Sequence, residues 1–290
     1  MRILVTADLH YNIARSQEPA RLLARRACAE GGDALVLVGD SAAAELDPLR
    51  QCLRLFADFP GRKFLVLGNH CLWCRSQEDS LHRYHRVLPQ TAAEEGFHLL
   101  DESPAVVGDL ALVGSVGWYD YSFRDLSLGI PEAFYRVKMA PGAAAYLGLH
   151  SDLLAEHRAD ITAEHLTMLW RWMDGVHVRL GISDEQFLAL LAERLAAHLE
   201  QAAGLGGRIV AFLHHLPLAA LVPPGRRPRT AFAAAFMGAA RLGDVLARCE
   251  KVSHVFCGHS HWPAEATVGR INVVNVGSTY TQKELKVLDL

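Results

Sequence analysis

The chain has 290 residues, of which 51% are hydrophobic, so it can bury a sizeable core and is expected to be globular. Its formal net charge is only −3, which excludes the broad basic surface that sequence-independent nucleic-acid binding requires. A small phosphorylated substrate is easier to accommodate, and nucleic acid is a poor fit as a partner.

Residues 1–8 are predicted to form a strand that starts at the initiator Met. No basic region, long apolar stretch or small-residue cleavage site precedes this strand, so we expect a cytoplasmic protein. The apolar runs at 34–39 and 208–213 have the length of strands. They are far shorter than the roughly 20 residues of a membrane span, so no membrane span is expected.

The first third of the chain alternates apolar strands with helix-like segments, which is typical of βαβ units. The predicted elements lie at residues 3–8, 18–29, 33–40, 46–56 and 63–69. Each strand ends in polar residues, and open α/β sheets bind ligands at the carboxyl ends of their strands.

From residue 96 the pattern changes to short strands, and Gly108-Asp109 suits a hairpin turn. Residues 118–207 are mostly helical and are predicted to be an insertion within a single domain that spans 1–290. The helix that ends this stretch begins at a capping box formed by Ser183 and Gln186.

The last third returns to strands at 208–213, 252–258 and 265–277, with a hairpin turn predicted at Gly269-Arg270, and a final strand at 285–290. A helix is predicted over 238–249. The loop that precedes it carries Arg226, Arg227 and Arg229. These guanidinium groups could bind a substrate phosphate, although a charged Pro/Gly loop is more often a solvated surface.

The six cysteines are expected to be free thiols, since a chain of this length does not need a disulfide framework. Cys71 and Cys74 have the spacing of half a zinc site, but no second pair completes four ligands. Metal-competent side chains gather instead at the predicted strand ends, and these are Asp8, His10, Asp40, Asn69, His70, His214, His215, His259 and His261.

This mixture of carboxylate, carboxamide and imidazole groups suits divalent ions such as Mn, Fe, Zn, Co or Ni. Seven ligands remain when His70 is left out and only one of His214 and His215 is counted, and seven are too many for one tetrahedral ion. They suit two ions roughly 3.5–4 Å apart, provided that one carboxylate bridges them, and such sites stabilise in-line displacement at phosphorus.

The order of these residues resembles that of the calcineurin-like metallophosphoesterases. The motifs that carry the resemblance are Asp8-Leu-His10, Gly39-Asp40, Gly68-Asn69-His70, His214 ahead of Pro217, and Gly258-His259-Ser260-His261. The resemblance implies an α/β fold, a four-layer αββα sandwich of two mixed sheets, with the helical insertion outside the match.

The resemblance also implies the role of each residue. One metal would be held by Asp8, His10 and His261, and the other by Asn69, His214 and His259, with Asp40 bridging the two. Metal-bound hydroxide would attack the phosphorus of a phosphate mono- or diester. His70 would be the catalytic residue that protonates or electrostatically assists the leaving oxygen.

Two positions leave alternatives open. Cys71 stands where the family usually has an acidic residue that orients the preceding histidine, so Asp120 or Glu78 would have to replace it. His214 and His215 are adjacent, and a strand sends neighbouring side chains to opposite faces. We choose His214 because it directly follows the apolar strand, whereas counting back from Pro217 would choose His215.

The aromatic residues after Gly117 are equally consistent with a substrate pocket and with core packing, and they are Trp118, Tyr119, Tyr121 and Phe123, followed by Arg124. The remaining histidines are interpreted as surface or helix residues, among them His82, His85, His150, His157, His165, His177 and His198. The alternatives to a phosphoesterase are a non-catalytic protein-interaction scaffold of the same fold, whose signature would be missing ligands, and a nuclease, whose signature would be a basic surface.

Overall fold

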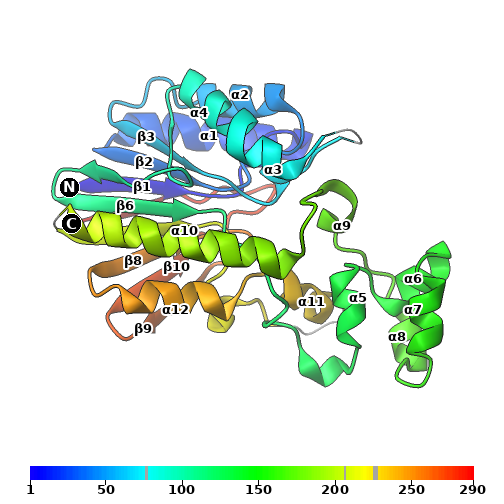
Figure 1. Cartoon of the computed structure of the whole chain (residues 1–290). Helices are drawn as coiled ribbons and strands as arrows, with labels where there is room; N and C mark the ends of the chain where they lie inside the picture. Colours follow the sequence, from blue (N-terminus) through cyan, green and yellow to red (C-terminus); the bar gives the residue numbers. More distant parts are fainter. Residues whose placement is uncertain (76–77, 206, 225–227) are drawn as a thin grey trace.

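The computed structural model describes residues 1–75, 78–205, 207–224 and 228–290. Two β-sheets stack face to face in it (Figure 1). The first sheet has the order β11-β1-β2-β3-β4, with bounds Lys286–Asp289, Arg2–Thr6, Ala34–Val38, Arg62–Val66 and His98–Leu99. The second has the order β5-β6-β7-β8-β10-β9, with bounds Ala105–Val107, Leu110–Ser115, Arg208–Leu213, Val252–Cys257, Ile271–Asn275 and Ala264–Val268.

Both sheets are mixed, because a group of parallel strands has an antiparallel strand at one edge of the first sheet and at both edges of the second. In the first sheet β11 pairs antiparallel with β1, while β1 to β4 are parallel. In the second sheet β5 and β9 are the antiparallel edges of a parallel β6, β7, β8 and β10. The two predicted hairpin turns, at Gly108-Asp109 and Gly269-Arg270, join β5 to β6 and β9 to β10.

Helices cover the outer face of each sheet (Figure 1). The first sheet carries α1 (Ala14–Glu30), α2 (Leu46–Arg54) and α4 (Leu88–Glu94). The second carries α10 (Asp184–Gly204) and α12 (Ala240–Arg248). The predicted four-layer αββα sandwich is therefore confirmed.

The strand sequences explain why both faces of each sheet are covered. Parallel strands buried on two sides are nearly continuous in apolar residues, and alternate side chains point to opposite faces. In β1, Ile3 and Val5 join the core between the two sheets, whereas Leu4 joins the core beneath the helices. In β2, Val36 and Leu37 divide in the same way.

The stretch from 118 to 207 has two kinds of helix. The short helices α5 to α9 project beyond the sandwich in Figure 1, and their bounds are Glu132–Arg136, Pro141–Leu147, Ser151–Glu156, Ala163–Thr167 and Asp174–His177. The long helix α10 instead packs against β6, β7 and α12 as part of the outer layer. It begins at the predicted capping box, in which Ser183 and Gln186 exchange hydrogen bonds of 2.9 and 3.2 Å.

Short helical turns complete the fold and lie mostly in the loops near the carboxyl ends of the strands. Their bounds are η1 His70–Leu72, α3 Ser80–His82, η2 Arg83–Val87, η3 Leu126–Leu128, η4 Ala219–Leu221, α11 Pro228–Ala233 and η5 Ala234–Phe236. Within the described residues, every helix is too short or too polar to cross a bilayer.

Gly114 in β6 gives a test of the packing between the sheets. A Cβ at this position would lie 2.4 Å from Leu100 Cβ and 2.7 Å from Val66 Cγ2. Because interiors this dense do not absorb an added methyl group without distortion, Gly114→Ala should lower the free energy of unfolding by roughly 1–3 kcal/mol. Gly204→Ala in α10 is the control, since a Cβ there meets nothing within 4 Å. Urea denaturation measures both, and equal stability of the two variants would contradict the packing argument.

Candidate metal centre

The predicted ligands gather at one end of the sandwich, where the carboxyl ends of strands from both sheets meet. Asp8 and His10 follow β1, Asp40 follows β2, and Asn69 and His70 follow β3, while His214 follows β7 and His259 and His261 follow β8. Backbone hydrogen bonds hold these loops in register. The His10 N–H donates to Asp40 O at 2.8 Å, and the His259 N–H donates to the Asp8 carboxylate at 3.1 Å.

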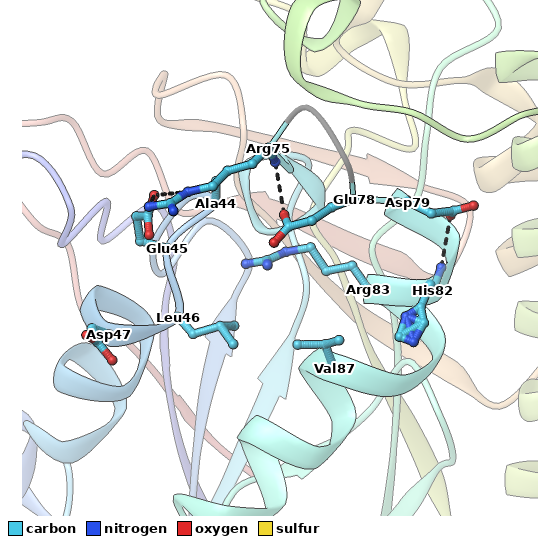
Figure 2. A pocket seen from close by; sticks show the side chains of 10 residues that line it. All are labelled: Ala44, Glu45, Leu46, Asp47, Arg75, Glu78, Asp79, His82, Arg83 and Val87. Carbon is cyan, nitrogen blue, oxygen red and sulfur yellow. Dashed lines mark hydrogen bonds and ion pairs between the residues drawn. The ribbon is translucent and has the colours of Figure 1, made fainter.

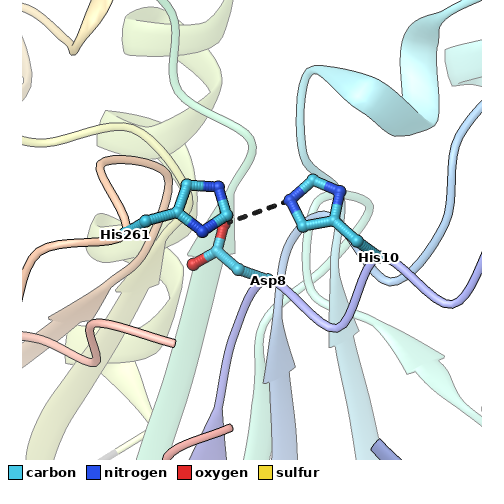
Figure 3. A group of neighbouring side chains, drawn as sticks. All are labelled: Asp8, His10 and His261. Atoms are coloured by element: carbon cyan, nitrogen blue, oxygen red, sulfur yellow. Dashed lines mark ion pairs between the residues drawn. The ribbon is translucent and has the colours of Figure 1, made fainter. Parts of the chain in front are cut away.

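The first cluster consists of Asp8, His10 and His261 (Figure 3). Asp8 Oδ1 lies 4.0 Å from His10 Nε2 and 3.9 Å from His261 Nε2. The Nδ1–H of His261 donates to Ser278 O at 2.7 Å, so its Nε2 is left to face the carboxylate. This is the usual arrangement around a metal-binding histidine, in which the second ring nitrogen is held by a backbone carbonyl.

The second cluster is centred on His214. Its Nε2 lies 3.3 Å from Asp40 Oδ2, 3.2 Å from Asn69 Oδ1 and 3.2 Å from His259 Nδ1. The opposite nitrogens of both histidines are occupied, because His214 Nδ1 donates to Val38 O and His259 Nε2 donates to Phe236 O. The remaining ring nitrogens, His214 Nε2 and His259 Nδ1, therefore face each other beside the oxygens of Asp40 and Asn69.

Asp40 links the two clusters. Its Oδ2 lies 3.6 Å from His10 Nε2 as well as 3.3 Å from His214 Nε2, and 3.8 Å from His70 Nε2. Its Oδ1 accepts the backbone N–H of His70 at 2.9 Å. One carboxylate thus faces side chains of both clusters, as a bridging ligand must.

His10 shows that the arrangement fits metal ions. Its side chain is fully buried, and neither ring nitrogen has a hydrogen-bond partner among the described residues. Leaving buried polar atoms unpaired is costly and uncommon. Coordination of a divalent ion by Nε2 would satisfy the nitrogen that faces Asp8 and Asp40, and the mixed N and O donors suit such an ion.

The charges in the second cluster act strongly on one another. Burial opposes protonation of His214, but the carboxylates of Asp40 and Asp8 outweigh it and raise the pKa of His214 to about 9. Burial likewise disfavours an ionised Asp40, yet His214 and His70 hold the pKa of that carboxyl well below its usual range. Burial raises the pKa of Asp8. A divalent ion held by these residues would replace the His214 proton as the positively charged partner of Asp40.

Backbone strain is concentrated at the same place. Eight non-glycine residues in the described part of the chain have positive φ. Five of them are predicted ligands, namely Asp8 at 56°, His10 at 43°, Asp40 at 48°, His259 at 70° and His261 at 56°. Such φ values are unfavourable for residues that carry a Cβ, although Asp and His tolerate them better than most. Strain that recurs at one site is typical of a functional constellation.

The glycines of the motifs allow the close approach of the loops. A Cβ at Gly39 would lie 2.0 Å from His214 Nδ1, and one at Gly68 would lie 2.1 Å from Asp40 Oδ1. Both distances are impossible for real atoms, so a larger residue at either position would displace a ligand.

His214 and His215 point to different surroundings, as expected for neighbours at a strand end. His215 donates from Nδ1 to Val116 O at 2.8 Å, and its ring packs against Trp118 and His259 at centroid distances of 5.1 and 4.3 Å. Burial and the neighbouring His214 lower the pKa of His215 to about 3. Only His214 directs a ring nitrogen to both Asp40 and Asn69.

His70 is oriented by an aromatic ring. It stacks on Trp73 with ring centroids 3.8 Å apart. The two carboxylates considered as its partner are engaged elsewhere, because Glu78 accepts the backbone N–H of Arg75 and Asp120 accepts that of Ser122. Cys71 is buried, and burial raises the pKa of its thiol to about 11, so it is a neutral neighbour.

Several residues of the site lie outside the motifs. Asp174 of α9 accepts a hydrogen bond from Asn69, and His177, interpreted from the sequence as a surface or helix residue, stacks on Trp73 at 4.5 Å. Tyr280 lies 4.9 Å from the His10 ring. No motif marks these residues in the sequence, since each comes from a segment without a recognisable pattern.

The aromatic residues after Gly117 belong to the core. Trp118, Tyr119 and Tyr121 are almost fully buried, and Arg124 pairs with Glu132 at 3.1 Å. The loop residues Arg226 and Arg227 and the side chain of Arg229 lie outside the part of the chain that the structure describes.

A cavity of about 420 Å³ opens beside the clusters. Its lining residues include Asn69, His70, Trp73, Arg171, Trp172 and His259. It combines metal-competent groups with aromatic surface and a guanidinium group.

A larger cavity of about 690 Å³ lies between α2 and the loop before α3 (Figure 2). Two of its charged side chains have partners within the protein, since Arg75 binds Glu45 and Arg83 donates to the carbonyl of Cys71. None of its described lining residues is a predicted ligand, so the smaller cavity is the candidate substrate site.

The model of the calcineurin-like phosphoesterase family matches residues 1–263. The chain belongs to this family. The resemblance seen in the motifs is thereby confirmed, and membership indicates a metal-dependent phosphoesterase. Divalent metals are characteristic of the family, and three groups of side chains here could hold one.

Solved structures share the fold at low sequence identity. A phosphopantetheinyl hydrolase from Mycobacterium tuberculosis superposes with a TM-score of 0.65 at 20% identity, covering 95% of this chain and 89% of its own. A dimetal phosphatase from Danio rerio gives a TM-score of 0.57 at 13% identity, covering 99% and 91%. A protein from Thermus thermophilus gives 0.54 at 12%, covering 99% and 98%. Among curated proteins, no match to the sequence is found.

The adjacent histidines provide a matched pair of variants. His214→Ala should lose metal, because it removes the nitrogen that faces Asp40 and Asn69. His215→Ala should largely keep it, because the ring is held by a backbone carbonyl outside the cluster. Elemental analysis of the purified variants gives the stoichiometry. The opposite result would move the ligand by one residue.

Proposed function

We propose that this chain is a dinuclear metal-dependent phosphoesterase that hydrolyses a phosphate mono- or diester. The observation that carries the proposal is the position of Asp40, whose carboxylate faces His10 of one cluster and His214 of the other. Two-metal sites of this type serve in-line displacement at phosphorus.

In this proposal the ligands divide as the clusters do. One ion is held by Asp8, His10 and His261, the other by Asn69, His214 and His259, and Asp40 bridges them. The ions are Mn, Fe, Zn, Co or Ni, according to the donor set. When bound, they supply Lewis-acid stabilisation of the phosphoryl oxygens and activation of the attacking water.

The protein itself positions the substrate and moves a proton. His70 is half-buried at the edge of the cavity, and its Nε2 faces Asp40 from outside the ligand set of the two ions. We assign it the donation of a proton to the leaving oxygen, which needs a group close to the phosphate but free of the metals. Stacking on Trp73 restricts the orientation of the ring.

The cavity favours a small phosphorylated substrate. Trp73 and Trp172 offer aromatic surface to an organic leaving group, and Arg171 offers donors to a phosphate oxygen. The low net charge of the chain argues against a nuclease. The complete ligand set argues against a non-catalytic scaffold.

The first test compares the rate of phosphate ester hydrolysis by the wild-type protein with that of the Asp40→Asn variant. Protein reconstituted with each of the candidate metals should hydrolyse p-nitrophenyl phosphate or its bis ester. Asp40→Asn should bind fewer than two equivalents of metal and lose nearly all activity, because its bridging charge is gone. Exposed Asp47→Asn is the control and should behave as wild type.

Substrate identity is then sought with phosphomonoesters, cyclic nucleotides, nucleotides and lipid-linked diphosphates. Phosphopantetheinyl compounds join this panel because one structural neighbour is named a phosphopantetheinyl hydrolase. Wild-type protein that binds metal but hydrolyses none of these would favour the scaffold alternative, and two full equivalents of metal in Asp40→Asn would refute the bridging role.

The role of His70 can be tested with leaving groups of increasing pKa. His70→Ala should lower kcat by roughly 10² to 10⁴ for a poor leaving group, which is the usual range for positioned acid catalysis. The loss should be much smaller with p-nitrophenolate, which needs little protonation, and metal content should stay unchanged. Equal losses across the series would refute the acid role, and lost metal would make His70 a ligand.

A further inference from the structure

Asp174, the first residue of α9, accepts four hydrogen bonds in the interior of the protein. Its Oδ1 accepts from Asn69 Nδ2 at 2.9 Å and Trp73 Nε1 at 2.7 Å. Its Oδ2 accepts from Tyr119 Oη at 3.1 Å and Trp172 Nε1 at 2.8 Å. The residue is only 1% exposed, so these contacts replace water almost completely.

We propose that Asp174 is a positioning residue that fixes the amide of Asn69 for metal binding. Its carboxylate holds the NH2 group of Asn69, which leaves Asn69 Oδ1 facing His214 Nε2 at 3.2 Å. This inference rests on the proposed function, because it requires Asn69 to be a metal ligand. It assigns part of the metal centre to the helical segment between β6 and β7, which contains none of the metal-ligand motifs.

A carboxylate is the side chain that this position requires. An ionised carboxyl group has only acceptors and can serve all four donors, whereas an amide would turn an NH2 group against two of them. An Asn69 that lost its partner could rotate and present NH2 to the metal. Amide nitrogen is not a ligand for the divalent ions considered, so the ion would lose one donor.

The same carboxylate reaches His70 through one intermediate ring. Trp73 donates to Asp174, and His70 stacks on Trp73 with centroids 3.8 Å apart. Position 71, which follows His70, carries a buried neutral thiol. Asp174 and Trp73 therefore provide the orientation of His70 that an acidic residue at position 71 would provide by direct contact.

The segment that carries Asp174 is fastened to the loop that carries Asn69. Cys74 N–H donates to His177 O at 2.9 Å, and Ser80 N–H donates to Arg179 O at 2.9 Å. The Arg179 guanidinium returns a hydrogen bond to Arg75 O at 2.7 Å. These contacts hold residues 174–179 against the loop, so the position of the Asp174 carboxylate is determined by both segments.

The direct test is metal affinity in Asp174→Asn. Calorimetric titration of metal-free protein with Mn²⁺ should show two sites in wild type. In the variant, the affinity of one site should fall about 10- to 100-fold, the usual effect of losing a group that orients a ligand, while the other site is unchanged.

Asp184→Asn is the matched control. Asp184 is also a buried carboxylate that accepts from a tryptophan and a tyrosine, Trp118 and Tyr121, but its described hydrogen bonds involve no predicted ligand. The control variant should lower the melting temperature and leave both affinities unchanged. Wild-type affinities in Asp174→Asn, or an equal loss in Asp184→Asn, would overturn the proposal.

A double-mutant cycle separates positioning from a general structural effect. If Asp174 acts through Asn69, then Asp174→Asn should weaken neither site further in an Asn69→Ala background. Additive losses would overturn the assignment. Wild-type protein that binds fewer than two ions would instead refute the proposed dinuclear function, so the two failures are distinguishable.

An isosteric exchange covers the case in which Asp174→Asn does not fold. Asn69→Asp alone places two carboxylates in contact in a buried site and should weaken the affected metal site. In the combined variant Asn69→Asp/Asp174→Asn, the amide at position 174 can donate a hydrogen bond to the carboxylate at position 69. The pair is then restored with donor and acceptor exchanged. The combined variant should bind that ion more tightly than Asn69→Asp alone, and an equal or weaker affinity would overturn the proposal.

Discussion

The contact between Asp40 and His214 is the interaction on which the site depends. The carboxylate comes from the first sheet and the imidazole from the second, and they meet at 3.3 Å with almost no exposure to water. Removing either partner would deprive the other, buried group of its nearest oppositely charged neighbour, which is costly in a protein interior. The two sheets must therefore stack at one particular offset, and the apolar layer between them holds that offset.

Polar ligands can be buried here because the backbone prepares their positions. Five of them adopt strained positive φ values. Because Gly39 and Gly68 have no Cβ, His214 and Asp40 can lie directly against the backbone at these two positions. The rigid parallel strands beneath supply the stability that offsets this strain. The result is a set of donors that converge before any cation arrives, so little reorganisation is required on binding.

The helical segment between β6 and β7 lines the cavity beside the two clusters. Asp174, Trp172 and Arg171 reach the cavity from this segment, while α10 returns to the sandwich as an outer layer. Part of the lining of the cavity thus comes from a segment that contains none of the predicted metal ligands. His70 is linked to this segment, because it stacks on Trp73 and Trp73 donates a hydrogen bond to Asp174.

The sequence alone predicted the sheets, the hairpin turns and the cap of α10, because these depend on local periodicity and short patterns. Motifs with fixed spacing also singled out the candidate ligands. Apolar alternation defines a strand, and a strand that ends in Asp-Leu-His brings its own ligands to the sheet edge. Only the tertiary structure decided which nitrogen of His214 faces Asp40, and that His215 turns toward Val116 and Trp118. The same holds for Asp174, which is 105 residues from Asn69 and becomes its partner only when the chain folds, since a single carboxylate carries no periodicity that a sequence pattern could reveal.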